Sequence, residues 1–442
     1  MKQTKFKQIK EKDPFEVSKF KQTEIGIIPE DWEVKNVEDF CMKITSGGTP
    51  LRNNKEYWEN GTIPWLKTQE LNDATIYAAE EKITQLGANN SSAKLFPKNT
   101  ILMAMYGATV GKLGLLKIEA TTNQAFCAMI VNKDVADYKY LFYALLRYRD
   151  NLINLASGAA QQNLNQDIIK NFKIPYPSLD EQKSIAKILS DLDSKIEFNQ
   201  QMNKTLESIG QALFKHWFVD FEFPNEKGKP YKSSGGEMID SELGKIPKGW
   251  KVGQVKDLGK IVCGKTPPTK DKENYGNDVP FITIPDMHGQ IFIFETERKL
   301  SQDGANTQQN KYLPPLSTCV SCIATPGMVV MTTVSSQTNQ QINSIIPKKD
   351  ISPYFVYFTM KNKTEEIKQK GLGGTTTLNL NTGNFEKINI LLPDIDIINL
   401  FHKIVDNMLN KILINNKSNL ELIKIRDSLL PKLMSGQVRV KT

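Results

Sequence analysis

Two stretches of the chain carry apolar residues at helical spacing over an unusual length. After Pro177, Ser178 stands three residues before Glu181, which is the spacing of a capping box. Apolar residues, with Asn199 among them, then recur every three or four positions, and no proline or glycine interrupts before Gly210. This stretch therefore predicts one helix of about 38 residues, roughly 57 Å long. The members of the series are Ile185, Ile188, Leu189, Leu192, Ile196, Asn199, Met202, Leu206, Ile209 and Leu213.

A second stretch near the end of the chain repeats this pattern. Pro393 precedes it, and Pro431 indicates where the helix ends or frays. Apolar spacing sustained over about four heptads is typical of a coiled coil, so the two helices are predicted to pair in antiparallel orientation. The members of this series are Phe401, Ile404, Val405, Met408, Ile412, Asn415, Leu422, Ile425 and Leu429.

Asn199 and Asn415 occupy the same position in the two series, 216 residues apart. A twofold axis through the helix centres would place these two side chains opposite one another. A buried polar pair of this kind would fix the register of the helices at some cost in stability. The alternative interpretation is that both amides reach solvent.

The rest of the chain is patterned differently. Short apolar runs bounded by Gly, Pro and Asn, such as 100–105 and 319–323, predict strands. Residues 138–152 and 352–370 predict shorter helices. The fold class that follows is α+β.

The chain also repeats itself internally. A step of 216 residues carries Gln124 onto Gln340, Leu164 onto Leu380 and Pro177 onto Pro393. Solenoid repeats run only about 20 to 50 residues, so each copy is a domain with its own core. Between these anchors most residues differ. The sequence therefore predicts two similar globular domains with different surfaces, related by a pseudo-twofold axis.

The predicted organisation has six parts. They are a Lys-rich tail (1–21), a first globular domain (22–177), a long helix (178–223), a flexible Gly-rich linker (224–238), a second globular domain (239–393), and a second long helix with a tail (394–442).

Composition narrows the class of protein. The formal charge of +8 and the pI near 8.9 suit a polyanionic partner such as nucleic acid. The sequence has no apolar run long enough to cross a bilayer and no secretory signal, so we expect a cytoplasmic protein. The Cys319 to Cys322 spacing has no second copy, so we expect small side chains beside a buried strand and no metal site.

Catalytic motifs are not evident in the sequence. Lys112 follows Gly111, yet the spacing of a phosphate-binding GxxxxGK[ST] loop is missing. The chain has three histidines: His216 and His402 fall in or beside the long helices, and His288 lies in a loop without an equivalent in the first copy. We therefore expect a chain without a reaction of its own.

The ordered, duplicated set of motifs resembles the specificity subunit of type I restriction–modification systems. The resemblance covers residues 23–440. Its carriers are Gly-x-Ile-Pro-x-x-Trp from Gly26 and from Gly244, Gly47-Gly48-Thr49-Pro50, Ile63-Pro64-Trp65, Asn123-Gln124-Ala125, Leu164-Asn165 before Ile174-Pro175, Asp180-Glu181-Gln182, the segment from Leu213 to Phe221, and the segment from Leu429 to Gly436. The second copy departs from the pattern, with Ile397 and Ile398 in place of Glu and Gln.

The resemblance implies that each globular domain is a target recognition domain for one half of a split double-stranded DNA sequence. It also implies that the paired helices hold the two domains apart and dock two modification (methyltransferase) subunits, with restriction subunits joining them. No cofactor is then expected in this chain, because S-adenosylmethionine, ATP and Mg belong to the partners.

Candidate DNA contacts are polar residues in loops that are repeated in position but differ in sequence. Each of these residues could equally be a solvated loop residue that does not contact DNA. The candidates in the first domain are Arg52, Asn53, Asn54, Lys55, Lys67, Thr68, Gln69 and Lys112. Those in the second are Lys265, Thr269, Lys270, Lys272 and Thr283.

An aromatic stripe at the end of the first long helix is a candidate contact for a methyltransferase subunit. It comprises Phe214, Trp217, Phe218 and Phe221, and its alternative role is in a domain core. Two other functions stay open: a tandem-domain nucleic-acid-modifying transferase, and a coiled-coil adaptor that does not bind DNA.

Overall fold

The computed structural model describes residues 19–156, 163–372 and 380–441, so the predicted Lys-rich tail lies almost wholly outside the described residues. The chain divides into two compact units. Unit 1 comprises residues 1–196 and 421–442, and unit 2 comprises residues 197–420. The 40-residue helices α5 (Leu179–Phe218) and α10 (Ile395–Met434) each give one part to unit 1 and the other part to unit 2. The units therefore divide within the long helices, whereas the sequence placed the domain borders at the helix ends.

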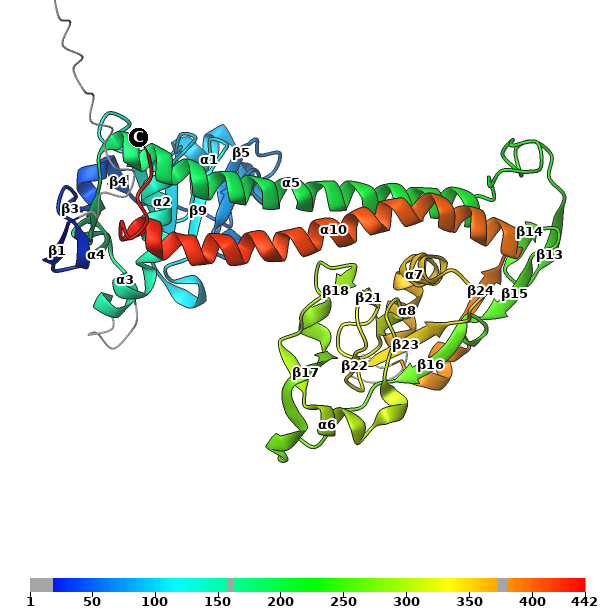
Figure 1. The fold of residues 1–442 in the computed structure, drawn as a ribbon. Helices are drawn as coiled ribbons and strands as arrows, with labels where there is room; N and C mark the ends of the chain where they lie inside the picture. Colours follow the sequence, from blue (N-terminus) through cyan, green and yellow to red (C-terminus); the bar gives the residue numbers. More distant parts are fainter. Residues whose placement is uncertain (1–18, 157–162, 373–379, 442) are drawn as a thin grey trace, which may run out of the picture. The chain divides into compact units, whose positions relative to one another are not determined.

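The two units contain equivalent elements in the same order (Figure 1). The strands of unit 1 are β1 Phe20–Thr23, β2 Gly26–Pro29, β3 Glu33–Asn36, β4 Cys41–Thr45, β5 Ile63–Leu66, β6 Ala74–Ile76, β7 Glu81–Ile83, β8 Ile101–Ala104, β9 Leu113–Leu116, β10 Thr121–Thr122, β11 Phe126–Val131 and β12 Lys173–Tyr176. Its short helices are α1 Gln85–Asn89, α2 Tyr138–Arg147, α3 Arg149–Ala156 and α4 Gln166–Lys170.

Unit 2 follows the same plan. Its strands are β13 Met238–Ser241, β14 Gly244–Pro247, β15 Lys251–Gln254, β16 Gly259–Cys263, β17 Tyr275–Ile282, β18 Phe292–Ile293, β19 Arg298–Leu300, β20 Thr318–Ser321, β21 Val329–Thr332, β22 Gln337–Thr338, β23 Ile342–Pro347 and β24 Asn389–Leu392. Its short helices are α6 Gln302–Asn306, α7 Pro353–Asn362, α8 Thr364–Leu372 and α9 Thr382–Glu386.

The sheets of the two units have the same strand order. The five-stranded sheet of unit 1 runs β4-β11-β8-β9-β6, and that of unit 2 runs β16-β23-β20-β21-β18. Each unit also has a three-stranded sheet with one parallel and one antiparallel pairing, β10-β5-β7 in one and β22-β17-β19 in the other. The predicted α+β class and internal repeat are confirmed at the level of strand order.

Local sequence explains where several elements start. Asp137 caps α2 by accepting from two backbone amides, and Ser352 caps α7 in the same way from Phe355. Each predicted helix of the globular domains is in fact two helices, because Tyr148 separates α2 from α3 and Lys363 separates α7 from α8. The proline at 431 lies inside α10, which continues to residue 434.

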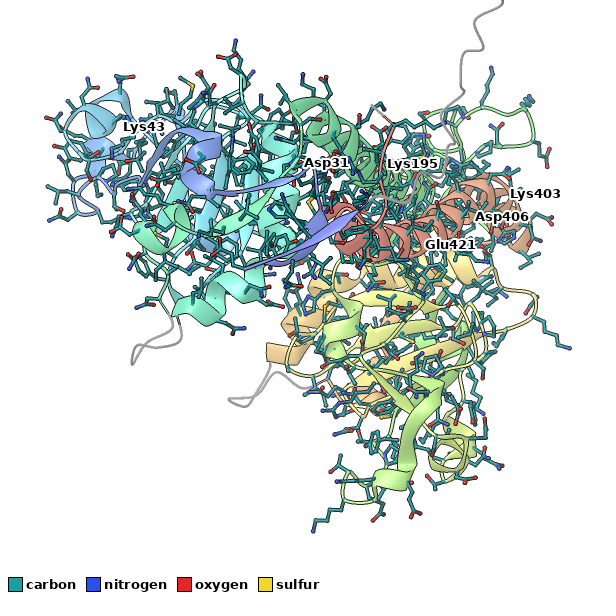
Figure 2. All side chains as sticks on the ribbon, turned by 60° about the vertical axis from the view of Figure 1, so that its left-hand side comes forward. Asp31, Lys43, Lys195, Lys403, Asp406 and Glu421 are labelled. Carbon is teal, nitrogen blue, oxygen red and sulfur yellow. The ribbon has the colours of Figure 1, made fainter. Side chains whose placement is uncertain are left out.

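Only half of the predicted capping box at the start of α5 forms. The Ser178 hydroxyl accepts a bond from the backbone amide of Glu181, at 3.3 Å. The Glu181 carboxylate is used elsewhere, accepting from the Trp32 indole at 2.9 Å and from Arg439 at 2.8 Å. Arg439 also binds Asp31 through both of its terminal nitrogens, and Figure 2 labels Asp31 beside the end of α10. These contacts fasten the C-terminal segment to the start of unit 1.

In unit 2 the segment after the long helix is held by aromatic contacts instead of charged ones. Phe223, which follows α5 as Arg439 follows α10, stacks on Trp250 with ring centroids 5.0 Å apart. Tyr231 also stacks on Phe223, with ring centroids 4.6 Å apart. Residues 224–238, predicted to be a flexible linker, form a hydrogen-bonded loop in which the Asn225 side chain binds Ser234 and two backbone amides. The aromatic stack gives this segment a packing partner that its Gly-rich composition does not indicate.

The core of each unit is closed by the end of a long helix. Leu430, Leu433 and Met434 of α10 are buried in the main core of unit 1. Phe214 and Phe218 of α5 are buried in the main core of unit 2. Burial of a large apolar side chain stabilises a fold by roughly 1.5–3 kcal/mol, so each unit depends on both helices.

Within each unit, α5 and α10 lie side by side and antiparallel (Figure 1). In unit 1, Arg426 of α10 binds Asp193 of α5 at 2.8 Å. In unit 2, Asn199 donates to Asn419, and Asn415 donates to Asn203, both at 2.8 Å. The predicted antiparallel pairing is therefore present in both units.

The asparagine contacts differ from the expected ones in one respect. Asn199 and Asn415 are buried, but they do not face one another, because each bonds an asparagine one helical turn away on the partner helix. The step of 216 carries the Asn199–Asn419 bond onto the Asn415–Asn203 bond. The local twofold axis therefore crosses α5 between Asn199 and Asn203. It relates two equivalent asparagine bonds, whereas the sequence predicted a single contact between Asn199 and Asn415.

The asparagine bonds predict an asymmetry between single and double substitutions. Asn199→Leu should lower the free energy of unfolding by about 1–3 kcal/mol, because it leaves the buried Asn419 amide without a partner. The Asn199→Leu/Asn419→Leu double variant should regain most of this loss, since both polar groups are gone. Urea unfolding followed by circular dichroism measures the effect. The control is Gln200→Leu on the exposed side of the same helix, and a double variant no more stable than the single one would contradict the prediction.

Candidate functional site

The loop after β4 in unit 1 presents the first group of candidate residues. Arg52 lies over the rings of Trp58 and Trp65, with its guanidinium carbon 3.8 Å and 4.4 Å from the ring centroids. The same guanidinium forms an ion pair with Glu81 at the start of β7. Arg52 therefore has its charge and its flat face engaged within the unit, which does not favour the predicted contact with DNA.

Lys67 lies in the same acidic environment. Its ammonium is 3.0 Å from Glu81 and 3.1 Å from Glu80. Burial acts to raise the pKa of Glu81, but the hydrogen bonds from Arg52 and Lys67 outweigh it and hold that pKa below its ordinary value. The pKa of Lys67 is raised, first by its hydrogen bond to Glu81 and then by Glu80. The neighbouring candidate Thr68 is buried.

Lys112 is the third cationic candidate of unit 1 that has an acidic partner. Its ammonium is 3.3 Å from Asp73, which also binds Arg149 at 2.9 Å. These partners lie 39 and 76 residues away from Asp73 along the chain. The pairs join separate segments of the unit and leave little of the Lys112 charge for a ligand.

The remaining candidates of unit 1 are available at the surface. Asn53 and Gln69 are exposed, and the Lys55 side chain is 84% exposed with Glu59 as a loose partner at 3.8 Å. Asn54 is half-buried and accepts a bond from the backbone amide of Glu56. Asn53, Lys55 and Gln69 are therefore the better-placed members of the predicted set.

Unit 2 is different, because its cationic candidates have no acidic partners. Lys265, Thr269, Lys270 and Lys272 are all exposed, and none of the three lysines forms an ion pair within the described residues. Thr283 is half-buried, and its hydroxyl donates to Asp286 at 2.7 Å. Most cationic candidates of unit 1 are thus paired with carboxylates, whereas the candidate lysines of unit 2 are open to a ligand.

Sequence reasoning missed one repeated pair of cations. Lys43 on β4 and Lys260 on β16 are both exposed, and β4 and β16 are the edge strands of the two five-stranded sheets. On the neighbouring strand, Lys43 pairs in register with Ile130, and Lys260 pairs with the equivalent Ile346. Figure 2 shows Lys43 among the exposed side chains of unit 1. The 217-residue step between the lysines is the signal that identifies them.

The aromatic stripe at the end of α5 is in the core of unit 2. Phe214, Trp217 and Phe218 are buried, and they pack around Phe401 of α10 with ring centroids 5.1–6.1 Å apart. Phe221 is half-buried with its edge against a tryptophan of the same core. The stripe therefore closes a domain core, and its buried rings leave almost no surface for a partner subunit.

Other apolar side chains of the long helices are exposed instead. They occur in three pairs related by the step of 216 residues, with similar exposed fractions within each pair. The pairs are Ile188 (38%) and Ile404 (37%), Phe198 (54%) and Ile414 (62%), and Ile209 (45%) and Ile425 (46%). The sequence had assigned Ile188, Ile209, Ile404 and Ile425 to the predicted coiled-coil seam, and the structure corrects that assignment.

Three of the groups that could suggest catalysis, one histidine and two cysteines, have structural contacts or lie in a core. His402 contacts the Ser352 hydroxyl at 2.8 Å, but Ser352 is the buried cap of α7. Cys319 and Cys322 are buried, and burial raises their thiol pKa values to about 12 and about 11. Among residues 19–156, 163–372 and 380–441, no group of three His, Cys, Asp or Glu side chains is placed to hold a metal.

Within the part of the chain that the structure describes, no helix combines the length and the apolar character needed to cross a bilayer.

Comparison with known families gives a match in each half of the chain. The family described as "Type I restriction modification DNA specificity domain" matches residues 29–208 and again residues 247–424. Each match contains the five-stranded and three-stranded sheets of one unit and most of one long helix. The duplication seen in the sequence and in the strand order is thus a duplication of this domain.

Relatives with assigned roles are similar along most of the chain. The HindI type I restriction enzyme specificity subunit of Haemophilus influenzae is 39% identical over 369 residues, covering 71% of this chain and 80% of its own length. The MjaIX specificity subunit of Methanocaldococcus jannaschii is 32% identical over 435 residues, covering 96% and 97%. The crystal structure of a type I restriction–modification S subunit from M. genitalium shares the fold with a TM-score of 0.57 at 16% identity, covering 91% of this chain and 96% of that one.

The Arg52–Glu81 contact gives a prediction about pH. Arg52→Gln should raise the pKa of Glu81 relative to the native chain, because Lys67 is then the one cation of the two left to oppose the effect of burial. The folded pKa in the native chain is lowered, so the stabilisation from this pair is present at neutral pH and is lost as the pH falls through that pKa. The substitution should thus cost less than about 1 kcal/mol, and more at pH 7 than in acid.

A carbon-13 NMR titration of the Glu81 carboxyl, with unfolding measured at the same pH values, tests this prediction. Lys55→Gln is the matched control, because Lys55 does not touch Glu81. An unchanged Glu81 titration in the Arg52 variant would show that the pair does not control this carboxylate.

Proposed function

The chain belongs to the type I restriction–modification DNA specificity family, and we propose that each of its two units reads one half of a split DNA target. In this proposal the chain supplies recognition to a complex in which other subunits carry out methylation and cleavage. The relatives named above are specificity subunits, which supports this role.

The observation that carries the proposal is the pairing of a shared frame with unlike surfaces. The two five-stranded sheets have the same strand order, whereas the candidate segments of the two units carry different polar and charged residues. Unit 1 presents Asn53, Lys55 and Gln69, while unit 2 presents Lys265, Lys270 and Lys272. Base edges are distinguished by the arrangement of such donors and acceptors, so two unlike loop sets suit two unlike half-sites.

The long helices are proposed to set the spacing between the half-sites. Each is a single 40-residue element that contributes to both units, and buried asparagine bonds fix the register of the pair in unit 2. A helix pair of fixed register resists stretching, because sliding would break those bonds and bury unpaired amides.

A matched heptad insertion tests the spacing role. Duplicating 197–203 in α5 together with the equivalent residues 413–419 in α10 adds about 10 Å of helix, close to three base pairs of DNA. We expect the spacer of the methylated sequence to lengthen while both half-sites stay the same. Methylome sequencing of a host that carries the chain with its cognate methyltransferase measures this.

The control for the insertion duplicates the heptad in α5 alone. This should abolish methylation, because the two helices no longer match in length. An unchanged spacer with the matched insertion would refute the spacing role without affecting the assignment of the two readers.

We further propose that two copies of a modification subunit dock on the long helices. One copy would contact the exposed apolar side chains of α5, and the other would contact their repeat equivalents on α10. Phe198 on α5 and Ile414 on α10 are both more than half exposed and are related by the internal repeat. Equivalent apolar side chains on two helices suit two copies of one partner, and exposed apolar groups of this kind commonly mark interfaces. Restriction subunits would join through the same complex.

Single substitutions in this pair should change the composition of the complex. Phe198→Ser or Ile414→Ser should each reduce the number of bound modification subunits from two to one, and the double variant should bind none. Native mass spectrometry of the purified complex counts the subunits. Val334→Ser, at an exposed apolar residue of a unit 2 loop, is the control and should leave both subunits bound. Two subunits on the double variant would rule out this surface.

In this assignment the chain has no catalytic role of its own, and S-adenosylmethionine, ATP and Mg would be bound by the partners. The proposal is supported by the relatives, which are specificity subunits. A cytoplasmic location follows from the proposed DNA substrate.

A further inference from the structure

One exposed hydrogen bond occurs at the same place in both units. In unit 1 the Thr49 hydroxyl donates to the side-chain oxygen of Gln124, at 2.7 Å. In unit 2 the Thr266 hydroxyl donates to the side-chain oxygen of Gln340. Both glutamines are exposed and both threonines are half-buried. We call these two pairs the Thr–Gln clasps.

The turn that carries each threonine is held by the same backbone bond but by unlike side chains. The amide of Gly48 donates to the carbonyl of Thr122 at 2.8 Å, as the amide of Lys265 donates to that of Thr338 at 3.0 Å. The carbonyl of Gly48 accepts from the Trp65 indole, whereas the carbonyl of Lys265 accepts from a glutamine amide of the α6 region. The geometry of the turn is therefore preserved although the residues that hold it have changed.

The loop that carries each glutamine is built in the same way. Asn123 accepts from the backbone amide of Ala125 at 3.0 Å, and Asn339 accepts from that of Gln341 at 3.1 Å. The threonine then orients the glutamine side chain through its oxygen. Among the described residues, the amide nitrogen of neither Gln124 nor Gln340 has a hydrogen-bond partner. Each clasp thus presents two N–H donors at a fixed place on the surface.

Each unit has an exposed lysine next to the segment that carries the clasp threonine, but the two lysines come from different parts of the repeat. In unit 1, Ser92 packs on Gly48, where a Cβ atom would lie 2.1 Å from its hydroxyl oxygen, and Lys94 then reaches the Thr45 hydroxyl at 2.7 Å. In unit 2, Lys265 itself takes the position of Gly48. Both lysines are exposed, and neither has a carboxylate partner in the described parts of the chain.

We propose that the Thr–Gln clasps, with Lys94 and Lys265, are equivalent contacts to the phosphodiester backbone of DNA, one in each unit. The inference rests on the proposed DNA-reading function. Two half-sites of different sequence have the same phosphates but different base edges, so a feature kept in both units suits the backbone, and the features that differ suit the bases. Amide N–H donors suit the acceptor oxygens of a phosphate, and an ammonium group in the same unit suits its charge.

Substitutions at the glutamines separate this role from simple bracing of the turn. Gln→Glu keeps the oxygen that accepts from the threonine, but it removes the N–H donors and adds a negative charge. If the clasp only braces the turn, Gln124→Glu and Gln340→Glu should bind DNA like the native chain. If it contacts phosphate, both should bind more weakly than the corresponding alanine variants.

Fluorescence anisotropy with the full chain and two labelled duplexes of unrelated sequence measures these effects. We expect Gln124→Ala and Gln340→Ala each to weaken binding about threefold to tenfold, equally for both duplexes. The exposed helix variant Gln200→Ala should bind like the native chain. A loss confined to one duplex would identify base reading instead and would overturn the proposal.

The lysines give a second readout. Lys94→Gln and Lys265→Gln should each lower the slope of log affinity against log salt by about 1, whereas the glutamine-to-alanine variants should leave the slope unchanged. Glutamate variants with native affinity would overturn the clasp proposal alone. A native chain that binds neither duplex would overturn the proposed function as well.

Discussion

The structure depends on the burial of each long-helix end in the core of a globular unit. Leu433 and Met434 of α10 complete the core of unit 1, while Phe214 and Phe218 of α5 complete the core of unit 2. In unit 1 these side chains come from the C-terminal end of α10, whereas the helix that begins in this unit is α5. In unit 2 they come from the C-terminal end of α5, whereas the helix that begins there is α10. Both units therefore need both helices, and the antiparallel pairing follows from the same requirement. A unit without the far helix end would expose several large apolar side chains, at a cost of roughly 1.5–3 kcal/mol each.

The internal repeat preserves geometry more closely than chemistry. The segment after each long helix packs on a tryptophan, yet unit 1 uses the charged Arg439 and unit 2 uses the aromatic Phe223. The turns before Thr49 and Thr266 are likewise held by an indole in one unit and by an amide in the other. Such replacements keep the backbone in place while the surface changes. This is what a protein with two readers on one frame requires, since the frame is shared and the targets are not.

The candidate contacts show where sequence reasoning was sufficient and where it failed. Asn53, Lys55 and Lys270 are exposed near the repeated anchors that pointed to them. Arg52 and Lys112 are instead bound to Glu81 and Asp73, which lie 29 and 39 residues away from them. No local pattern indicates such partners, because the strands that bring them together are paired through the tertiary fold. Lys43 was missed for the opposite reason, since one exposed lysine is informative only when its counterpart Lys260 is placed on the equivalent edge strand.

The sequence by itself determined the duplication, the α+β class and the two long helices, because these depend on residue spacing and on repeats that can be read along one chain. The tertiary structure alone decided which helix face meets which neighbour. Spacing of three and four residues placed Ile188 and Ile404 in the predicted seam, but only the packed units show that these two side chains stay exposed. Likewise, Asn199 was recognised as a core position, whereas its partner Asn419 was set by the offset at which antiparallel helices interlock. Periodicity defines a stripe on one helix, and the partner surface defines which part of that stripe is buried.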